Sequence, residues 1–416
     1  MTTPAPERRV YLDHAAATPL AAAVAEAMRE AEAEAFANPS SPHAAGRAAK
    51  RILEDARERI LALVGGRTSG SVRDRLVFTS GATEANRLAI LGLAAGWGGG
   101  GVPAPGWIAF SARDHSSIRH PARELGQRGW RLCEAPLGPR GALAAEAVVA
   151  SAHESPADHA GRILAVTTVC GHSGIREDTS AVEWIAAGVP GLCVHADATQ
   201  AAGWDEIAFA TSPWATLALA PHKFGGPRGI GGVVVRGGVP LAATVPGSQE
   251  LGLRGGTEAV YLASGFARAL ELSAADRTLA AARVTALRER LEAGLVAAAR
   301  RAGYEALVVG AEAPRAPHVA LVALAGVDRQ VAALAADMAG VCLATGTACA
   351  SGSTEPPAIL AALGVPDRFR DGGLRLSLGR TTTPADVEAA IVRLSDVFVR
   401  LAGAGPAPGA SKGEPP

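Results

Sequence analysis

The chain has 416 residues, 48% of them hydrophobic, with a formal net charge of zero and a sequence pI of about 7.2. This balance argues against a nucleic-acid-binding protein, which would show a basic excess, and the apolar runs are too short to span a bilayer. Five scattered cysteines without a CxxC pair argue against a disulfide framework or a zinc site. Together with a polar N-terminus that lacks a signal-peptide pattern, they favour a cytoplasmic enzyme.

The predicted elements start with a short strand over Val10–Asp13 and two helices over Leu20–Phe36 and Ala44–Val64. Continuous apolar runs then alternate with helical stretches, which is typical of a mostly parallel sheet with helices on both faces. The sequence therefore predicts an α/β fold with a seven-stranded sheet. The expected strands are Arg75–Phe78, Trp107–Ser111, Arg131–Ala135, Ile163–Val169, Leu192–Ala196, Ala215–Leu219 and Gly232–Arg236.

The length favours more than one domain, and we expect four parts along the chain. An N-terminal segment, residues 1–20, is expected to pack on the smaller domain, and residues 21–258 form the large α/β domain. A long amphipathic helix around Ala259–Ala302 leads into a smaller α+β domain, so that both lie within residues 259–402. The Gly- and Pro-rich tail, residues 403–416, is expected to be disordered.

The run Thr79–Glu84 lies between a predicted strand and the helix that follows it. Small residues at such a turn let backbone N–H groups approach an anion, and the helix N-terminus adds positive potential. A helix start capped by a hydroxyl side chain would explain the same residues equally well. Because no Gly-Lys-Ser/Thr follows, a nucleoside triphosphate is not favoured as the anion.

Two ionisable residues follow predicted strands further along the chain. Asp197 comes after the apolar run Leu192–Ala196, at the sheet edge where ligands of parallel α/β folds gather. A carboxylate there can keep a heterocyclic nitrogen protonated, although a helix N-cap would select the same residue. Lys223 follows the strand Ala215–Leu219 in a chain whose basic residues are almost all arginine. A buried lysine can form a Schiff base, whereas the plain alternative is a lysine whose ammonium stays in solvent.

An anion site, an acid and an amine in this order are the parts that bind pyridoxal 5'-phosphate. They would take its phosphate, its ring nitrogen and its aldehyde respectively. His115 follows the strand Trp107–Ser111, where an imidazole could lie on the cofactor ring and exchange protons with a substrate. A single histidine is more often structural, so this assignment depends on the other residues.

A collinear series of motifs makes the chain resemble the cysteine desulfurase family, which belongs to the class V, fold-type I pyridoxal-phosphate enzymes. The resemblance extends to about Leu401 and implies a large cofactor-binding domain with a smaller C-terminal domain. The motifs are Tyr11–Ala16, Asn38–Ser41, Phe78–Asn86, His195–Gln200, His222-Lys223, Arg254–Thr257 and Gly346–Cys349. Each motif alone would be weak, but their order is specific for the superfamily.

The resemblance implies a role for each matching residue of the cofactor site. Lys223 would carry the cofactor and shuttle protons, Asp197 would pair with the ring nitrogen, and Gln200 would donate to the ring hydroxyl. His115 would stack on the ring. The residues that match the phosphate cup are Ala82, Thr83 and His222.

Three further residues carry expectations from the same resemblance. Thr257 would reach the phosphate across a dimer interface, which implies a homodimer. Arg375 would clamp the carboxylate of the substrate, a planar group that suits a bidentate guanidinium. Cys349 lies among small residues in a stretch expected to be mobile, and it would take the sulfur as a persulfide and pass it to an acceptor.

The chain departs from the family pattern around the cofactor. Cys170-Gly171-His172 stands where Asn-Asn-Glu is usual, so Gly171 replaces an asparagine that contacts the ring hydroxyl. Ala220 replaces a hydroxyl residue near the phosphate, Gly255 a serine and Leu251 an arginine. Each lost neutral hydrogen bond costs about 0.5–1.5 kcal/mol, so cofactor binding should be weakened or retuned without being abolished.

The function expected from this resemblance is the conversion of L-cysteine to L-alanine with transfer of sulfur to Cys349. The altered residues also suit another class V reaction, such as that of a selenocysteine lyase, a β-lyase, an epimerase or a biosynthetic C–S enzyme. A non-catalytic paralogue is a third alternative. The sequence identifies neither the sulfur acceptor nor the pathway.

Overall fold

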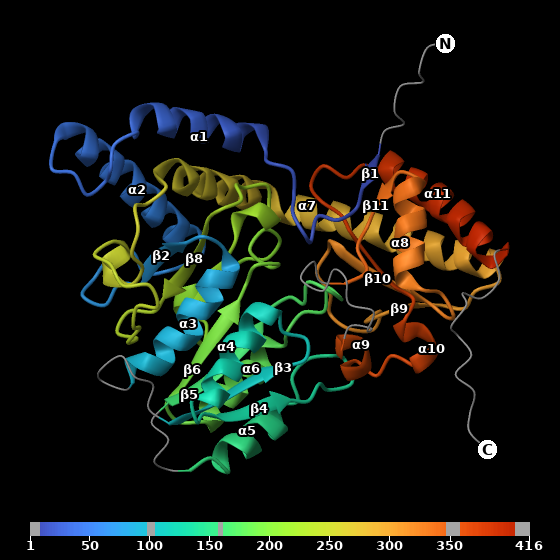
Figure 1. The fold of residues 1–416 in the computed structure, drawn as a ribbon, viewed down its shortest axis with the longest axis horizontal. Coiled ribbons are helices and arrows are strands. Elements are labelled where there is room, and N and C mark those ends of the chain that lie inside the picture. The colour runs from blue at the N-terminus through green and yellow to red at the C-terminus, as the bar shows by residue number, and fades with distance from the viewer. Residues whose placement is uncertain (1–8, 98–104, 157–160, 347–357, 404–416) are drawn as a thin grey trace.

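The computed structural model describes residues 9–97, 105–156, 161–346 and 358–403. Two lobes lie side by side, and one long helix, α7 (Val260–Arg301), runs along both of them (Figure 1). Its 42 residues span about 63 Å at the usual rise of 1.5 Å per residue. Phe266, near its start, belongs to the core of the larger lobe, whereas Leu291, near its end, belongs to the core of the smaller one. The long helix predicted around Ala259–Ala302 therefore holds the two cores together.

The larger lobe is built on a seven-stranded sheet of order β2-β8-β7-β6-β5-β3-β4. All neighbouring strands are parallel except the pairs made by β8, which is antiparallel to both β2 and β7. The predicted α/β fold is confirmed. The strands are β2 (Arg75–Thr79), β3 (Gly106–Ser111), β4 (Arg131–Ala135), β5 (Gly161–Thr167), β6 (Leu192–Asp197), β7 (Trp214–Leu219) and β8 (Gly231–Val235).

One strand ends earlier than its apolar run predicts. The run Ile163–Val169 includes two threonines but ends on the apolar Val169, whereas β5 ends at Thr167. Beyond it Val169 pairs with Arg176 in an isolated bridge, so the chain turns back at the carboxyl edge of the sheet. Hydrophobicity alone does not distinguish a strand residue from a buried residue of such a turn.

Helices cover both faces of this sheet, as alternation of side chains along a strand requires. The helices are α1 (Ala22–Glu34), α2 (Ala44–Leu63), α3 (Ala82–Gly96), α4 (Ser116–Gln127), α5 (Ala145–His153) and α6 (Thr179–Gly188), with short 3-10 turns η1 (Phe209–Thr211), η2 (Pro221–Lys223) and η3 (Glu250–Gly252). In β3, Trp107 and Ala109 join the core shared with α2, α5 and α6. Ile108 and Phe110 join the core on the other face, with α3 and α4.

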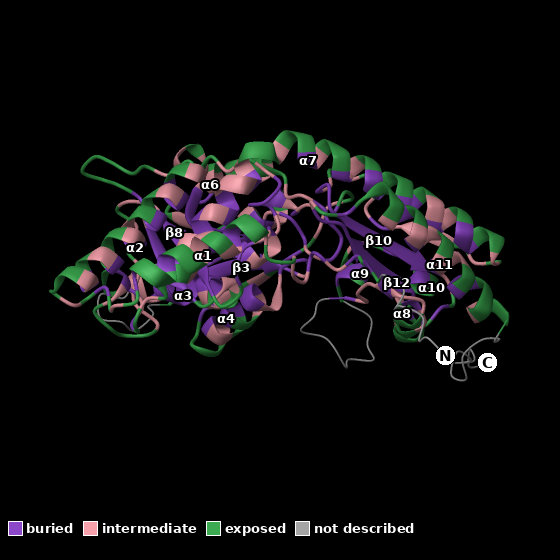
Figure 2. Cartoon of the chain, turned by 90° about the horizontal axis from the view of Figure 1, so that it is seen from above, coloured by how far each residue is buried: buried purple, intermediate pink, exposed green. Residues whose placement is uncertain are grey.

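The smaller lobe has an antiparallel sheet of order β12-β10-β9 and a two-stranded parallel pair of β1 with β11. Its strands are β1 (Val10–Tyr11), β9 (Ala306–Val308), β10 (Val319–Leu324), β11 (Val341–Cys342) and β12 (Gly373–Ser377), and its helices are α8 (Arg329–Met338), α9 (Ala358–Ala362), α10 (Asp367–Arg370) and α11 (Pro384–Gly403). Figure 2 shows that β10 and β12 are buried while much of the outer surface of α7 is exposed.

The N-terminal segment belongs to the smaller lobe by its packing, since Val10 and Leu12 are buried in that lobe's core. The predicted division at residues 20, 258 and 402 stays a prediction. Of the tail 403–416, which is expected to be disordered, Gly403 is the last residue of α11, and 404–416 lie outside the described residues. Among the helices that are described, none combines the length and apolarity needed to cross a membrane. The described His, Cys, Asp and Glu side chains form no cluster suited to a metal ion.

Candidate active site

A cavity of about 710 Å³ is lined by residues of both lobes at the carboxyl edge of the large sheet. This is the edge where parallel α/β folds bind ligands, and the volume lies in the range of about 300–1,000 Å³ found for small-molecule sites. The structure brings most of the predicted site residues together there. Those that line the cavity are Ala82, Thr83, His115, Asp197, Gln200, His222, Lys223 and Arg375.

The first turn of α3 forms one part of this cavity. Its N-cap, Gly81, supplies no side chain to accept from the helix N–H groups, and Ala82 and Thr83 line the cavity directly after it. Glu84 accepts a hydrogen bond from Ser80 N at 2.6 Å and is itself paired with Arg254 at 2.9 Å, so its carboxylate is held by both partners. The first N–H groups of a helix lack partners within it, and this terminus therefore suits an anion.

Lys223 lies in the turn η2, directly after β7, and is half-buried. Its ammonium Nζ donates to two backbone carbonyls of the N-terminal segment, Ala15 O at 2.8 Å and Ala16 O at 2.9 Å. The neighbouring His222 O accepts from Thr18 N and Thr18 Oγ1 at 2.8 and 3.0 Å, which fixes the same segment against the turn. Hydrogen bonds from a segment distant in sequence thus hold the amine at the cavity.

Asp197 ends β6 and is only 4% exposed. Its Oδ1 accepts from Thr199 N at 2.9 Å, and its Oδ2 accepts from the side-chain Nδ2 of Asn86 at 2.8 Å. These donors fix the plane of the carboxylate, as is required for a buried charge that must meet a ligand atom in one direction. Asn86, on α3, is a residue of the site whose role the sequence did not predict.

His115 is the N-cap of α4, and its ring nitrogen Nδ1 is the capping acceptor. The backbone N–H of Ser117 donates to Nδ1 at 3.1 Å, and Ser117 Oγ lies 2.8 Å from the same nitrogen. Burial lowers the pKa of His115, and the charges of Lys223 and Arg119 lower it further against the opposing effect of Asp197. At His222, burial lowers the pKa to about 4, with Lys223 and Arg228 acting in the same direction. Both imidazoles are therefore neutral at pH 7.

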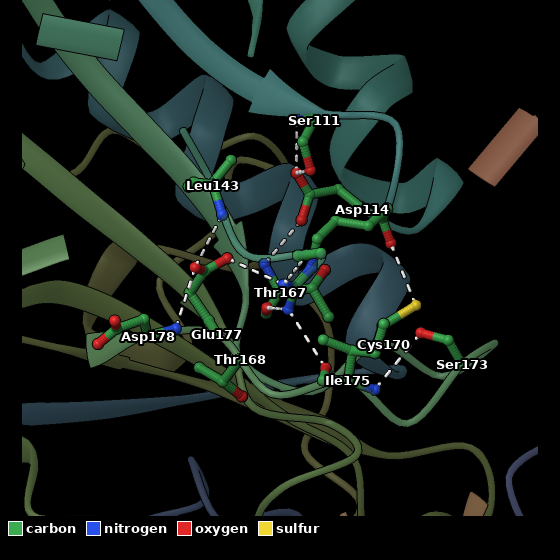
Figure 3. A network of polar contacts seen from close by, with 12 residues as sticks. Ser111, Asp114, Leu143, Thr167, Thr168, Cys170, Ser173, Ile175, Glu177 and Asp178 are labelled. Carbon is green, nitrogen blue, oxygen red and sulfur yellow. Dashed lines mark hydrogen bonds and ion pairs between the residues drawn. The ribbon is translucent and has the colours of Figure 1, made fainter. Parts of the chain in front are cut away.

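A buried polar network around Asp114, the residue before His115 in the sequence, fixes this loop (Figure 3). The Asp114 carboxylate accepts from Ser111 N and Thr167 N, each at 2.7 Å, and burial raises its pKa. Arg113 pairs with Glu177 at 3.2 Å and donates to Thr167 O at 2.9 Å. These contacts join the ends of β3 and β5, so the position of His115 is set by the sheet behind it.

Gln200 is held by groups other than a ligand. Its Nε2 donates to Ala15 O at 2.9 Å and its Oε1 pairs with His318 Nε2 at 3.0 Å. A Cβ added at Gly171 would lie 3.1 Å from Gln200 Nε2. The glycine that replaces the usual asparagine thus gives Gln200 room, and one amide hydrogen of Gln200 remains for a ligand.

A further wall of the cavity is formed by Arg375 on β12 and by His172. Arg375 is 3% exposed, donates to Asp13 Oδ1 at 2.8 Å and to Gly171 O at 3.2 Å, and has no partner for Nε. His172 is equally buried, and neither of its ring nitrogens has a hydrogen-bond partner. Burial lowers the pKa of His172 to about 3, with the charges of Arg375 and Arg329 adding to the effect.

Asp13 and Arg329 are further residues whose part in the site the sequence did not predict. Asp13 belongs to the motif Tyr11–Ala16, so the motif pointed to its region but not to its partner. Arg329 lies at the start of α8, lines the cavity and is 6% exposed. No local pattern in the sequence distinguishes it from the many other arginines.

Two predicted residues do not join the cavity in the described part of the chain. Thr257 is exposed and does not line it, so its role across a dimer interface stays a prediction. Cys349 lies outside the described residues. The described residues on either side of that segment, Gly346 and Ala358, both line the cavity.

The fold and this cavity define a pyridoxal-phosphate enzyme of the class V aminotransferase family, and the model of that family matches residues 10–390. Within it, the chain belongs to the cysteine desulfurase family. It is 33% identical to a cysteine desulfurase of Cereibacter sphaeroides, over 94% of this chain and 96% of that one. It is also 32% identical to a selenocysteine lyase of Bos taurus, with 96% of each chain covered. The solved structure of a NifS-like protein from Rickettsia africae shares the fold, with a TM-score of 0.81 at 23% identity over 94% of this chain and 99% of that one.

The residues present fit the cofactor that this family uses. The α3 terminus with Ala82 and Thr83 suits its phosphate, the fixed carboxylate of Asp197 suits its ring nitrogen, and the amine of Lys223 suits its aldehyde. The neutral ring of His115 lies in the same cavity. Groups suited to the phosphate, the ring nitrogen and the aldehyde are therefore all present at the cavity, although Ala220 has no hydroxyl and Gly171 no side chain.

Proposed function

We propose that this protein is a cysteine desulfurase that converts L-cysteine to L-alanine and leaves the sulfur on Cys349 for transfer to an acceptor. The single observation that carries the proposal is the meeting of Lys223, Asp197 and Arg375 in one cavity. An amine, an acid and a carboxylate-binding guanidinium around one cavity are what such a reaction on an amino acid needs. Pyridoxal phosphate, when bound, withdraws electrons from the substrate carbon that loses its proton.

Arg375 would bind the carboxylate of cysteine. In the structure its guanidinium is paired with Asp13, and its Nε is buried without a partner. A substrate carboxylate would supply the missing acceptor and form the charge-assisted bidentate contact that arginine favours. Lys223 would take the proton from the substrate carbon and later return one to the product, since an amine held among carbonyls at the cavity is placed for proton transfer.

Cys349 would receive the sulfur. Its thiolate forms an S–S bond to the substrate sulfur as the C–S bond breaks, and the electron pair of that bond stays with the carbon skeleton, which takes up protons to become alanine. The positions of Gly346 and Ala358 at the cavity support this role. We also propose a homodimer, a sulfur-acceptor protein or small molecule as partner, and a cytoplasmic location.

The test is turnover of L-cysteine by the purified protein with a thiol reductant. Alanine and sulfide should appear in equal amounts, and Cys349→Ser should abolish both. Unchanged turnover in that variant would contradict the persulfide route. A purified protein without the absorbance of bound cofactor would instead favour the non-catalytic alternative.

Selenocysteine lyase activity is the second candidate, because a selenocysteine lyase is among the relatives at 32% identity over nearly the whole chain. Comparing kcat/KM for L-cysteine and L-selenocysteine separates the two. A protein that releases selenium but leaves cysteine unchanged would be a lyase, and the desulfurase proposal would fail.

A further inference from the structure

A continuous path of buried hydrogen bonds runs from Asp197 to His115, outside the contacts that the cofactor itself would make. Its centre is Asn86 on α3, whose side chain is fully buried. Asn86 Nδ2 lies 2.8 Å from Asp197 Oδ2 and 2.8 Å from Ser117 Oγ, while Asn86 Oδ1 lies 2.9 Å from His195 Nε2. Ser117 Oγ in turn lies 2.8 Å from His115 Nδ1.

The charge of Asp197 fixes the direction of each of these bonds. An ionised carboxylate can only accept, so the amide atom of Asn86 that faces it must be the NH2 group. The oxygen of Asn86 therefore faces His195, whose Nε2 must carry a hydrogen. The remaining ring nitrogen of His195 accepts from Thr216 Oγ1 at 2.9 Å. Burial lowers the pKa of His195 to about 4, which agrees with a neutral ring between these partners.

Ser117 connects Asn86 to His115. The second hydrogen of Asn86 Nδ2 goes to Ser117 Oγ, so the hydroxyl of Ser117 keeps its own hydrogen for His115 Nδ1. The backbone N–H of Ser117 also points to Nδ1 because the imidazole caps α4. A ring nitrogen that accepts from two donors carries no hydrogen, and a neutral imidazole must then hold its hydrogen on Nε2.

We propose that Asn86 and Ser117 are positioning residues. Through their hydrogen bonds the negative charge of Asp197 selects the tautomer of His115 that carries its hydrogen on Nε2, at the active site. His115 then acts as a hydrogen-bond donor through Nε2 and does not take a proton at that atom. This assignment deepens the proposed function, on which its catalytic meaning rests. The charged and titratable groups around His115 are Asp197, Lys223, Arg119 and His120.

The direct test is nuclear magnetic resonance of the cofactor-bound protein labelled with ¹⁵N-histidine, with the His115 signals assigned by their absence in His115→Gln. We expect an unprotonated Nδ1 and a protonated Nε2 at pH 7. In Ser117→Ala one of the two donors to Nδ1 is lost, so the Nδ1 signal should move toward that of a mixed tautomer population. Ser117→Thr keeps a hydroxyl and should restore the native signature.

A matched control is Ser151→Ala, which removes another serine hydroxyl whose bond, from Trp107 Nε1 at 3.2 Å, lies away from this path. It should leave the His115 signals unchanged. A hydrogen on Nδ1 in the native protein would overturn the proposal, as would a Ser117→Ala spectrum identical to the native one. Asn86→Ala, where it folds, should move the signals of both His115 and His195.

Kinetics provide a second readout. Ser117→Ala should lower kcat for cysteine by about 2- to 10-fold with little change in KM, the effect of one hydrogen bond that orients a donor. A change confined to KM would contradict a role at His115. The tautomer measurement requires no turnover, so an inactive protein with the expected signals would refute the desulfurase function and leave this inference standing.

Discussion

The two walls of the cavity differ in how completely their polar groups are satisfied. On the wall formed by Asp197, His115 and Lys223, every one of these side chains is held by at least one hydrogen bond from the protein. On the wall formed by His172 and Arg375, both nitrogens of His172 and the Nε of Arg375 are buried without a partner. Because unpaired buried polar groups are costly, the first wall is prepared in advance, whereas the second holds groups that a bound ligand would satisfy.

Under the proposed function, this difference separates the groups for the cofactor from the groups for the substrate. Groups that must hold a resident molecule in one orientation gain from rigid support, and the N-terminal segment and α3 supply it. Groups that bind and release a substrate in each cycle must exchange partners, and the Asp13–Arg375 pair at 2.8 Å offers such an exchange. Substitutions on the two walls should therefore affect cofactor retention and substrate turnover differently.

Loss of the amine at the prepared wall should have the largest effect. Lys223→Ala should remove the absorbance of the bound cofactor and lower turnover of cysteine at least about 1,000-fold, because both attachment and proton transfer are lost. Lys50→Ala, at an exposed position of α2, is the matched control and should leave both unchanged. Full activity in Lys223→Ala, measured as alanine formation, would disprove the assigned role.

At the second wall, Arg375→Ala should lower kcat/KM for L-cysteine by at least about 100-fold, since charge-assisted hydrogen bonds to the carboxylate contribute about 1.5–3 kcal/mol each. The absorbance of the cofactor should remain, because this side chain belongs to the substrate wall. Arg368→Ala, on the surface with a 60% exposed side chain, serves as the control. Loss of the cofactor in Arg375→Ala would remove the distinction between the walls.

Because several histidines are buried, we expect the free energy of unfolding to fall in acid. Burial lowers the pKa of His318 and His172 to about 3, below the ordinary value of 6.5. Below pH 6.5 the unfolded chain binds protons that the folded chain does not, so the free energy of unfolding falls as the pH drops from 6.5 toward 3. Each histidine should contribute a loss of about 2 kcal/mol at pH 5.

Urea unfolding at pH 7 and pH 5 measures this loss. In His318→Gln the difference between the two pH values should shrink by about 2 kcal/mol, whereas a substitution of the exposed His153 should not change it. An unchanged difference in His318→Gln would mean that the buried ring is protonated in the folded state.

A methyl group at Gly171 should have the smallest effect. The added Cβ would lie 3.1 Å from Gln200 Nε2, closer than most real contacts, so Gly171→Ala should cost about 1 kcal/mol of stability. Gln200 would have to move from Ala15 O, and cofactor affinity should fall by a few-fold. Stability and dissociation of the cofactor in Gly171→Ala measure the two effects, and a gain in either would show that the glycine does not serve to admit Gln200.

Much of the fold could be read from local pattern. The strand predicted over Arg131–Ala135 has the bounds of β4, and the helix predicted over Ala44–Val64 differs from α2 by one residue. Apolar runs and helical periodicity are local properties, so they can be recognised without knowledge of the tertiary structure. The overrun at Val169 shows the limit, because burial in a turn gives the same apolar signal as burial in a strand.

The site could be predicted as a set of residue types but not as a set of contacts. Lys223 and Asp197 could be predicted from their residue types and from their positions directly after predicted strands. Their partners did not, because the bond between Asp13 and Arg375 joins positions 362 residues apart, and the bonds of Asn86 depend on how α3 packs on α4 and β6. Such pairs follow from tertiary packing, on which a single sequence carries no local signal.

The most direct test of the account is to reduce the cofactor-bound protein with borohydride and locate the modified residue by peptide mass spectrometry. The chain has Lys50, Lys223 and Lys412 as candidates. The pyridoxyl group should be found on Lys223 and on neither of the others. Its attachment to Lys50 or Lys412, or a cofactor-bound protein with no modified lysine, would contradict the account.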